Sequence, residues 1–270
     1  MDRDTSSWLI PLVLAAAVGA CLWYYWNNIV NQDAAPPQVS EQPPVEDSEP
    51  RIGPLHPIPG ADFADQTQSD LRPLPPLNES DEYFRLELTD LFGEPVANII
   101  VGTRIIERVV ATVDNLPRGH VAERMRPVSA LSSGFSVESE GGNLYAITSD
   151  SYHRYDPLVA VVSSVDANIL IDLYRRYYPL FQKAYVDLGY PRGFFNDRLV
   201  EAIDDMLATP VVEEPVILIR PHVLYEFEDP DLESRSSGQK LMLRMGSDNA
   251  ALIKEKLRQV REMIANDVNM

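Results

Sequence analysis

Few residues of this sequence stand at spacings that would support catalysis or metal binding. The segment Ser236–Lys240 superficially suggests a phosphate-binding loop, but Glu233 stands where the first glycine should be and Leu241 replaces the Ser or Thr. No G-x-G-x-x-G or G-x-S-x-G pattern is present. The histidines lie far apart in the chain and share no ligand spacing: His56, His120, His153 and His222. We therefore predict no metal, no cofactor and no catalytic residue.

Acidic residues occur in neighbouring pairs, an arrangement that could serve general acid and base chemistry. The pairs are Asp204 with Asp205, Glu213 with Glu214, and Asp229 with Asp231. Glycoside hydrolysis needs two carboxylates about 5–10 Å apart in a cleft. Adjacent acids on a helix point in different directions, so spacing alone does not make such a pair. The favoured interpretation is a solvated acidic surface, and a carboxylate-dependent cell-wall hydrolase is an alternative.

Aromatic residues are concentrated in one region, where they could form a binding surface. Eight of the 12 tyrosines fall between residues 145 and 190, and arginines are interleaved with them. Tyr and Arg anchor many interfaces, and aromatic rings also stack on sugars. Several of these tyrosines have helical spacing, so packing in the core is the competing interpretation. Within the region, the loop 190–195 is the segment we expect to be exposed. The predicted binding surface comprises Tyr174, Tyr178, Tyr190, Arg192, Phe194, Phe195 and Arg198.

Composition excludes several classes of protein. The 270 residues include 23 Lys and Arg against 41 Asp and Glu, so the formal net charge is −18. Such acidity argues against nucleic-acid binding, which needs clustered basic residues for phosphate contacts. A single cysteine excludes an intramolecular disulfide framework and a Cys-rich zinc module. The apolar fraction of 45% is ordinary for a globular protein.

The N-terminal region predicts a transmembrane helix over residues 8–26, after a tail over 1–7. No charge occurs between Asp4 and Asp33, and 19 helical residues span about 28 Å, close to the bilayer core. Trp8 and Trp26 lie at the ends, as in an interfacial aromatic belt. A buried helix and a cleaved signal peptide are alternatives. A further alternative is a lipoprotein signal, because Val18–Cys21 resembles a lipobox.

Charge placement predicts the orientation of this helix. Arg3 and the α-amino group precede it, whereas no Lys or Arg follows until Arg51. The positive-inside rule therefore places the N-terminus in the cytoplasm and the C-terminal bulk outside it. We expect a single-pass protein of the bacterial inner membrane with a periplasmic domain.

A linker is predicted over residues 27–76. It holds 11 of the 22 prolines and eight acidic residues, but only two arginines. A segment of this composition buries too little apolar surface to offset its ordering entropy. Proline density favours an extended polyproline II conformation, which would reach up to roughly 150 Å. The linker would hold the following domain away from the membrane.

Residues 77–265 are predicted to form one globular domain, before a C-terminal tail over 266–270. Its fold class is α+β, predominantly α-helical, with a β-hairpin and short strands. Alternating polarity around Glu140–Asn143 is the clearest hairpin signal. Pro179 is expected to break or kink a helix that Asp166 caps. Strands are predicted at 135–139, 144–148, 216–219 and 223–227. Helices are predicted from 78 or 80 to 92 and over 95–115, 157–163, 167–188, 194–207, 232–245 and 248–265.

Several segments resemble one bacterial family. They look like parts of DUF3014, a membrane-anchored domain of unknown function, and the layout of span, proline-rich linker and domain is similar too. The resemblance covers most of residues 77–265 and implies no activity, ligand or catalytic residue. The segments that carry it are Val110–Pro117, Tyr178–Tyr185, Leu188–Pro191, Phe194–Glu201 and Gly238–Gly246.

These observations favour a membrane-anchored envelope protein over an enzyme. We expect the exported domain to be a protein-interaction or scaffold module, held to the lipid bilayer by residues 8–26 and paired with an envelope protein. A ligand- or carbohydrate-binding module is an alternative, as is the cell-wall hydrolase. The sequence predicts neither the partner's identity nor the oligomeric state.

Overall fold

A computed structural model describes residues 53–58, 73–119, 125–129, 131 and 134–265. The predicted membrane helix, which contains Cys21, lies outside these residues, and so do both predicted tails and His120. Of the predicted linker, only residues 53–58 and 73–76 are described. Within the described ranges, no single helix has the length and apolar character to cross a membrane. Two segments, Ser149–Ser164 and Ala167–Asp187, meet those criteria only as a pair bent by 79°.

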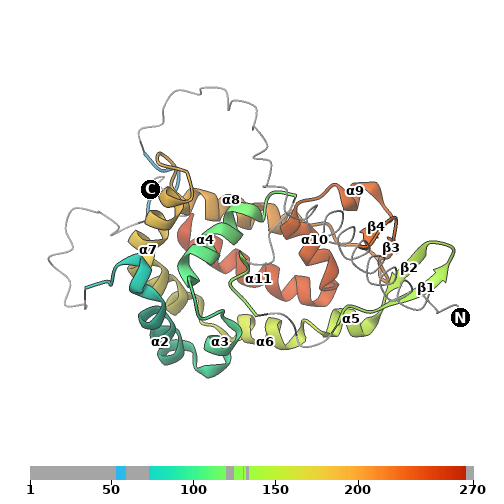
Figure 1. The fold of residues 1–270 in the computed structure, drawn as a ribbon, viewed down its shortest axis with the longest axis horizontal. Coiled ribbons are helices and arrows are strands. Elements are labelled where there is room, and N and C mark those ends of the chain that lie inside the picture. Colours follow the sequence, from blue (N-terminus) through green and yellow to red (C-terminus); the bar gives the residue numbers. More distant parts are fainter. Residues whose placement is uncertain (1–52, 59–72, 120–124, 130, 132–133, 266–270) are drawn as a thin grey trace, which may run out of the picture. The chain divides into compact units, whose positions relative to one another are not determined.

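The described residues form a predominantly helical α+β domain with a small antiparallel sheet, as predicted. A 3₁₀ turn, η2 (Leu77–Glu79), precedes the first helix. The helices are α2 (Ser80–Phe92), α3 (Glu94–Ile99), α4 (Ile105–Asn115), α5 (Ser149–His153), α6 (Asp156–Ser164), α7 (Ala167–Asp187), α8 (Phe195–Leu207), α9 (Pro230–Glu233), α10 (Ser237–Arg244) and α11 (Ser247–Ile264). The strands are β1 (Val137–Gly141), β2 (Leu144–Ile147), β3 (Ile217–Ile219) and β4 (Glu226–Phe227). Figure 1 shows the strands gathered beyond α5 and α10, away from α2 and α7.

The sheet is built on the predicted hairpin. Its strand order is β1-β2-β3-β4, and every neighbouring pair is antiparallel. The turn consists of Gly142 and Asn143. Gly142 and the preceding Gly141, which ends β1, have φ of 60° and 100°, a conformation that favours glycine. Of the strand predicted over 223–227, only the last two residues pair with β3, because Pro221 to Tyr225 form a loop.

Two predicted helices are divided in the structure. The helix expected over 95–115 is α3 and α4, because Arg104 adopts a left-handed φ of 52° and Ile100 pairs with Val128. The carboxylate of Asp81 on α2 accepts hydrogen bonds from the amides of Arg104 and Ile105, at 2.6 and 2.8 Å, and so starts α4. Likewise the helix expected over 232–245 is α9 and α10, since the Ser236 hydroxyl caps α10.

Helix α7 is continuous through Pro179, so the break that we predicted as one effect of this proline does not occur. Asp166 caps its N-terminus as predicted, accepting hydrogen bonds from the amides of Asn168 and Ile169. The helix has 21 residues and buries a face from Ile171 to Tyr185. Packing of this face against four other helices outweighs the hydrogen bond that proline removes.

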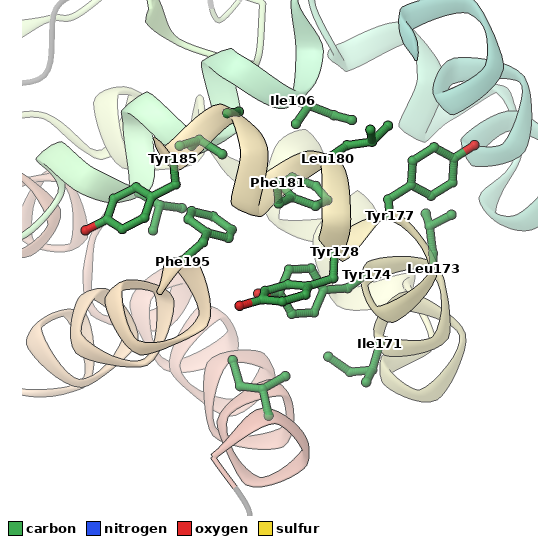
Figure 2. Packing of buried hydrophobic residues seen from close by; sticks show 14 of the residues in the cluster. Ile106, Ile171, Leu173, Tyr174, Tyr177, Tyr178, Leu180, Phe181, Tyr185 and Phe195 are labelled. Atoms are coloured by element: carbon green, nitrogen blue, oxygen red, sulfur yellow. The ribbon is translucent and has the colours of Figure 1, made fainter. Parts of the chain in front are cut away.

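Aromatic rings on α7 make the centre of the largest hydrophobic cluster. Phe181 stacks on Phe195 of α8 with centroids 5.5 Å apart, and Tyr174 contacts both rings. On another side of α7, Phe84 of α2 meets the edge of Tyr177 at 4.8 Å. Figure 2 shows Tyr174, Phe181 and Phe195 between the helices. Two smaller clusters lie under the sheet and around Met242.

Part of the predicted linker contacts this domain. The backbone amides of Leu55 and His56 both donate to the carboxylate of Asp197, each at 2.9 Å. The side chain of Asn196 is fully buried and donates to the carbonyls of His56 and Ile264, at 2.8 and 3.1 Å. Residues 53–58 are therefore held against the start of α8.

Burial of the tyrosines predicts an alkaline limit to stability. Burial raises the pKa of Tyr152 and Tyr174, and it raises the pKa of Tyr178 and of Tyr185 to about 12, with smaller contributions from nearby carboxylates. The folded chain thus holds these phenol protons more tightly than the unfolded chain. Their contribution to stability is present below pH 10 and is lost as pH rises from about 10 towards 12. Urea denaturation should show a falling midpoint across that interval, together with rising tyrosinate absorbance. A constant midpoint there would contradict the burial of these hydroxyls.

Candidate functional site

Three residues of the predicted binding surface lie in the core. Tyr174, Tyr178 and Phe195 are 9%, 4% and 1% exposed. The Tyr174 hydroxyl donates to Asn196 Oδ1 at 3.1 Å, and the Tyr178 hydroxyl donates to Gln182 Oε1 at 3.2 Å. These side chains pack the domain, so in this structure a partner could not reach their rings (Figure 2). Both tyrosine hydroxyls have a hydrogen-bond partner, as expected for tyrosines in a core.

Two other predicted residues, Tyr190 and Arg198, converge on a buried carboxylate. Asp114 at the end of α4 is 3% exposed. Its Oδ1 accepts from Arg118 and from Arg198, each at 3.1 Å, and its Oδ2 accepts from the Tyr190 hydroxyl at 3.2 Å. Arg198 also donates to the Asp114 carbonyl and pairs with Glu201 at 2.6 Å. Burial lowers the pKa of Arg198, but Glu201 and Asp114 more than offset this and raise it.

The loop 188–194 is held by this cluster and by Gln182. Tyr190 stacks on Tyr185 with centroids 4.6 Å apart. Gln182 donates to the Gly193 carbonyl at 2.7 Å and accepts from the Phe195 amide at 2.8 Å. A Cβ at Gly193 would lie 2.9 Å from the Tyr185 ring, so the chain needs glycine there. The loop that we expected to be exposed is thus anchored to α4, α7 and α8, and only Pro191 and Arg192 within 190–195 are exposed.

The remaining predicted residues, Arg192 and Phe194, lie nearer the surface. Arg192 is exposed, and Phe194 is partly buried where its carbonyl accepts the Arg198 amide at 3.3 Å. The seven predicted residues therefore do not share one accessible face, and binding by the exposed part of the loop stays a prediction. The segments Val110–Pro117 and Phe194–Glu201, which carry part of the family resemblance, contribute Asp114 and Arg198 to this cluster.

The acidic pairs do not converge on a common point in the described part of the chain. Asp204 pairs with Arg261, whereas Asp205 accepts from Ser236 and Gln239. Glu214 accepts from the Ser247 amide at 2.6 Å. The described ranges contain no group of three or more His, Cys, Asp or Glu side chains that could hold a metal ion. These carboxylates serve helix ends and ion pairs.

An apolar cavity of about 380 Å³, partly open to solvent, lies among the helices. We call it the apolar cavity. Its deep wall consists of buried side chains such as Phe84, Ile105, Ile171, Tyr174 and Phe181. Partly exposed residues complete it nearer the mouth: Phe92, Ile99, Ile100, Val109, Pro127, Val128, Val162, Val165, Leu170, Leu199, Lys256 and Val260. Only apolar surface faces inward. The cavity therefore suits a hydrocarbon and offers nothing to a sugar ring.

The size of this cavity has an energetic consequence. Well-packed interiors contain few voids larger than a water molecule. Because the cavity is partly open, its apolar lining faces solvent unless a ligand covers it, and that exposure costs free energy in proportion to its area. Water gains little from entering, because it finds no polar partner. An apolar occupant would remove most of this cost.

Lys256 is the one charged side chain among the residues that line the cavity. It is half-buried on α11, and its ammonium donates to the Val165 carbonyl at 2.6 Å. This bond joins α11 to the connection between α6 and α7. The lining surface is wholly apolar, so Lys256 contributes its methylenes to the cavity, while its ammonium is bonded to Val165, another lining residue, as in other snorkelling lysines.

The cavity was not foreseen from the sequence. Its walls come from α2, α3, α4, α6, α7, α8, α11 and the segment 127–128, which only the fold brings together. Each residue taken alone is an ordinary core residue with helical spacing. A signal existed only in the excess of Val, Ile and Leu on half-exposed helix faces, which does not distinguish a cavity from a filled core.

The comparisons with known proteins identify a family but no activity. The family model described as a protein of unknown function (DUF3014) matches residues 105–261, more than half of the chain. This confirms the resemblance found in the sequence. No curated protein and no solved structure matches the chain.

The Asp114 cluster predicts strong coupling between two residues. Asp114→Asn should lower the free energy of unfolding by about 3 kcal/mol, because it leaves the half-buried Arg198 without its deepest partner. Arg198→Met should lower the free energy of unfolding by a similar amount. The double variant should lower it by at least about 1 kcal/mol less than the sum of the two single variants. Urea denaturation measures all three.

An exposed ion pair provides the control for this double-mutant comparison of Asp114 and Arg198. Arg258→Met removes a 3.3 Å pair with Glu255, and both side chains are more than half exposed. Its effect should stay below about 0.5 kcal/mol. Additive losses for Asp114→Asn and Arg198→Met would show that the two residues do not act together.

Proposed function

We propose that this chain, which belongs to the DUF3014 family, is a membrane-anchored protein of the bacterial cell envelope whose exported domain binds an apolar ligand. The apolar cavity is the observation that carries the binding function. Binding is favoured over chemistry because the inner surface of the cavity is apolar and Lys256 is the one charged side chain among its lining residues.

The proposed membrane anchor rests on sequence alone. Residues 8–26 are free of charge and flanked by aromatics, and the chain that follows is rich in proline and acid. The linker up to residue 52 would keep the domain within reach of the bilayer, since residues 53–58 contact α8. Tethering a hydrocarbon-binding domain beside a membrane would place it next to a source of acyl chains.

A protein-interaction module remains the second candidate, and an exposed apolar loop favours it. Val223 and Leu224, in the connection between β3 and β4, are 77% and 76% exposed. Adjacent exposed apolar residues are common at interaction sites. If the domain served only as a scaffold, it would bind no small apolar molecule, and a probe of the cavity separates the two functions.

Filling the cavity should abolish binding without unfolding the domain. Val162 is partly exposed on α6 and lines the cavity. We expect the full-length chain, kept soluble in an amphipathic polymer, to bind the neutral fluorophore 1-aminoanthracene. In Val162→Trp the indole would occupy the mouth, so the affinity should fall about tenfold or more. The same variant should gain about 0.5–2 kcal/mol of stability, as cavity-filling substitutions do.

The matched control is Ala160→Trp, which adds the same ring to an exposed position on the same helix. It should bind the fluorophore like the wild type. Loss of binding in both variants, or in neither, would contradict the assignment of the cavity as the binding site.

The anchor and orientation are tested separately. Protease added to spheroplasts should digest the C-terminal domain while a cytoplasmic control protein survives. Alkaline carbonate should leave the chain in the membrane fraction, as it does for spanning proteins. Protection of the domain in spheroplasts would contradict export, and extraction by carbonate would contradict the span.

A further inference from the structure

We infer that the ligand of the apolar cavity is a fatty carboxylate whose head group pairs with Lys256. This inference rests on the proposed binding function and names its substrate class. The cavity supplies a site for a chain, and the mouth supplies one positive charge. The two features together select an amphiphile over a plain hydrocarbon.

The volume suits a single chain. A methylene takes up about as much space as a water molecule, ~30 Å³, so the cavity of 380 Å³ would hold roughly a dozen carbons. A two-chain lipid would leave its second chain in water. The deep wall is formed by residues of α2, α4 and α7, including Ile105 at 0% and Ile171 at 2% exposure. The end of the chain would therefore lie against side chains that solvent does not reach.

The charge at the mouth selects the head group. Lys256 Nζ makes a 2.6 Å hydrogen bond to the Val165 carbonyl, which uses one of its three donors. A carboxylate at the mouth could accept from another. The nearest acid on this edge, Asp166, accepts from the amides of Asn168 and Ile169 at 2.8 and 3.2 Å. These hydrogen bonds lower the pKa of Asp166, and the charge of Lys256 lowers it further, so Lys256 already faces this carboxylate and an incoming anion would share its ammonium.

The cavity lining has no polar surface, and this disfavours ligands that carry several polar groups. A sugar or peptide would bury hydroxyls or amides against a wall that has no donor or acceptor facing inward. A compact carboxylate leaves only its head at the mouth, where water and Lys256 satisfy it. The rest of the ligand needs nothing but apolar contact.

The test compares dodecanoate with dodecanol, which has the same chain and no charge. Both would displace 1-aminoanthracene from the full-length chain in the amphipathic polymer. We expect the wild type to bind dodecanoate about tenfold more tightly than dodecanol, because a hydrogen bond to an ionised group is worth more than one to a neutral group. Lys256→Met should remove this preference and keep dodecanol binding. Lys256→Arg should restore the preference.

A neighbouring lysine gives the matched control. Lys254 lies two residues earlier on α11, where its ammonium donates to the Thr209 carbonyl beside a different hollow. Lys254→Met should keep the preference for dodecanoate. Equal binding of the two ligands by the wild type, or a preference that survives Lys256→Met, would overturn the fatty-carboxylate assignment while the cavity function stood. Failure of the wild type to bind either ligand would overturn both.

Discussion

The burial of one face of α7 is the constraint on which the rest of the structure depends. The face carries large rings, and α4, α8, α11 and α2 all pack on this helix. Its tyrosine hydroxyls need partners once they leave water, which Asn196, Gln182 and Glu87 provide. The same helix is continuous through Pro179, because the surrounding packing stabilises it by more than the loss of one backbone hydrogen bond destabilises it.

The apolar cavity follows from how this aromatic face is covered. Rings of α7 and α8 fit each other closely, with Phe181 and Phe195 stacked at 5.5 Å. Above them, α2, α3 and the segment 127–128 are tied by other bonds: Asp81 caps α4, and Ile100 pairs with Val128. These contacts hold α2, α3 and the segment 127–128 at a distance from α7 that their aliphatic side chains do not fill. A space of about 380 Å³ therefore remains between these segments and the aromatic face of α7.

Local chemistry made much of the fold predictable, but not the site. Asp166 caps α7, and the hairpin turns within Glu140–Asn143, as the sequence indicated. The division of the 95–115 helix was not predictable, because its cause is a carboxylate on another helix, Asp81. The tyrosines are concentrated between residues 145 and 190 as the sequence shows, yet most of them are buried in the core. Neither the Asp114 cluster nor the cavity has a signature within one segment, since each is assembled from several helices.

The central claim is that the folded domain takes a single hydrocarbon chain into its interior. The most direct measurement uses dodecanoate with a nitroxide at its last carbon, added to full-length protein with labelled isoleucine methyl groups. The account predicts strong paramagnetic broadening of Ile105 and Ile171, which line the cavity and are 0% and 2% exposed. Ile147, which is equally buried but belongs to strand β2 and to a separate cluster, should be unaffected. Unchanged Ile105 and Ile171 signals at saturating ligand would contradict the claim.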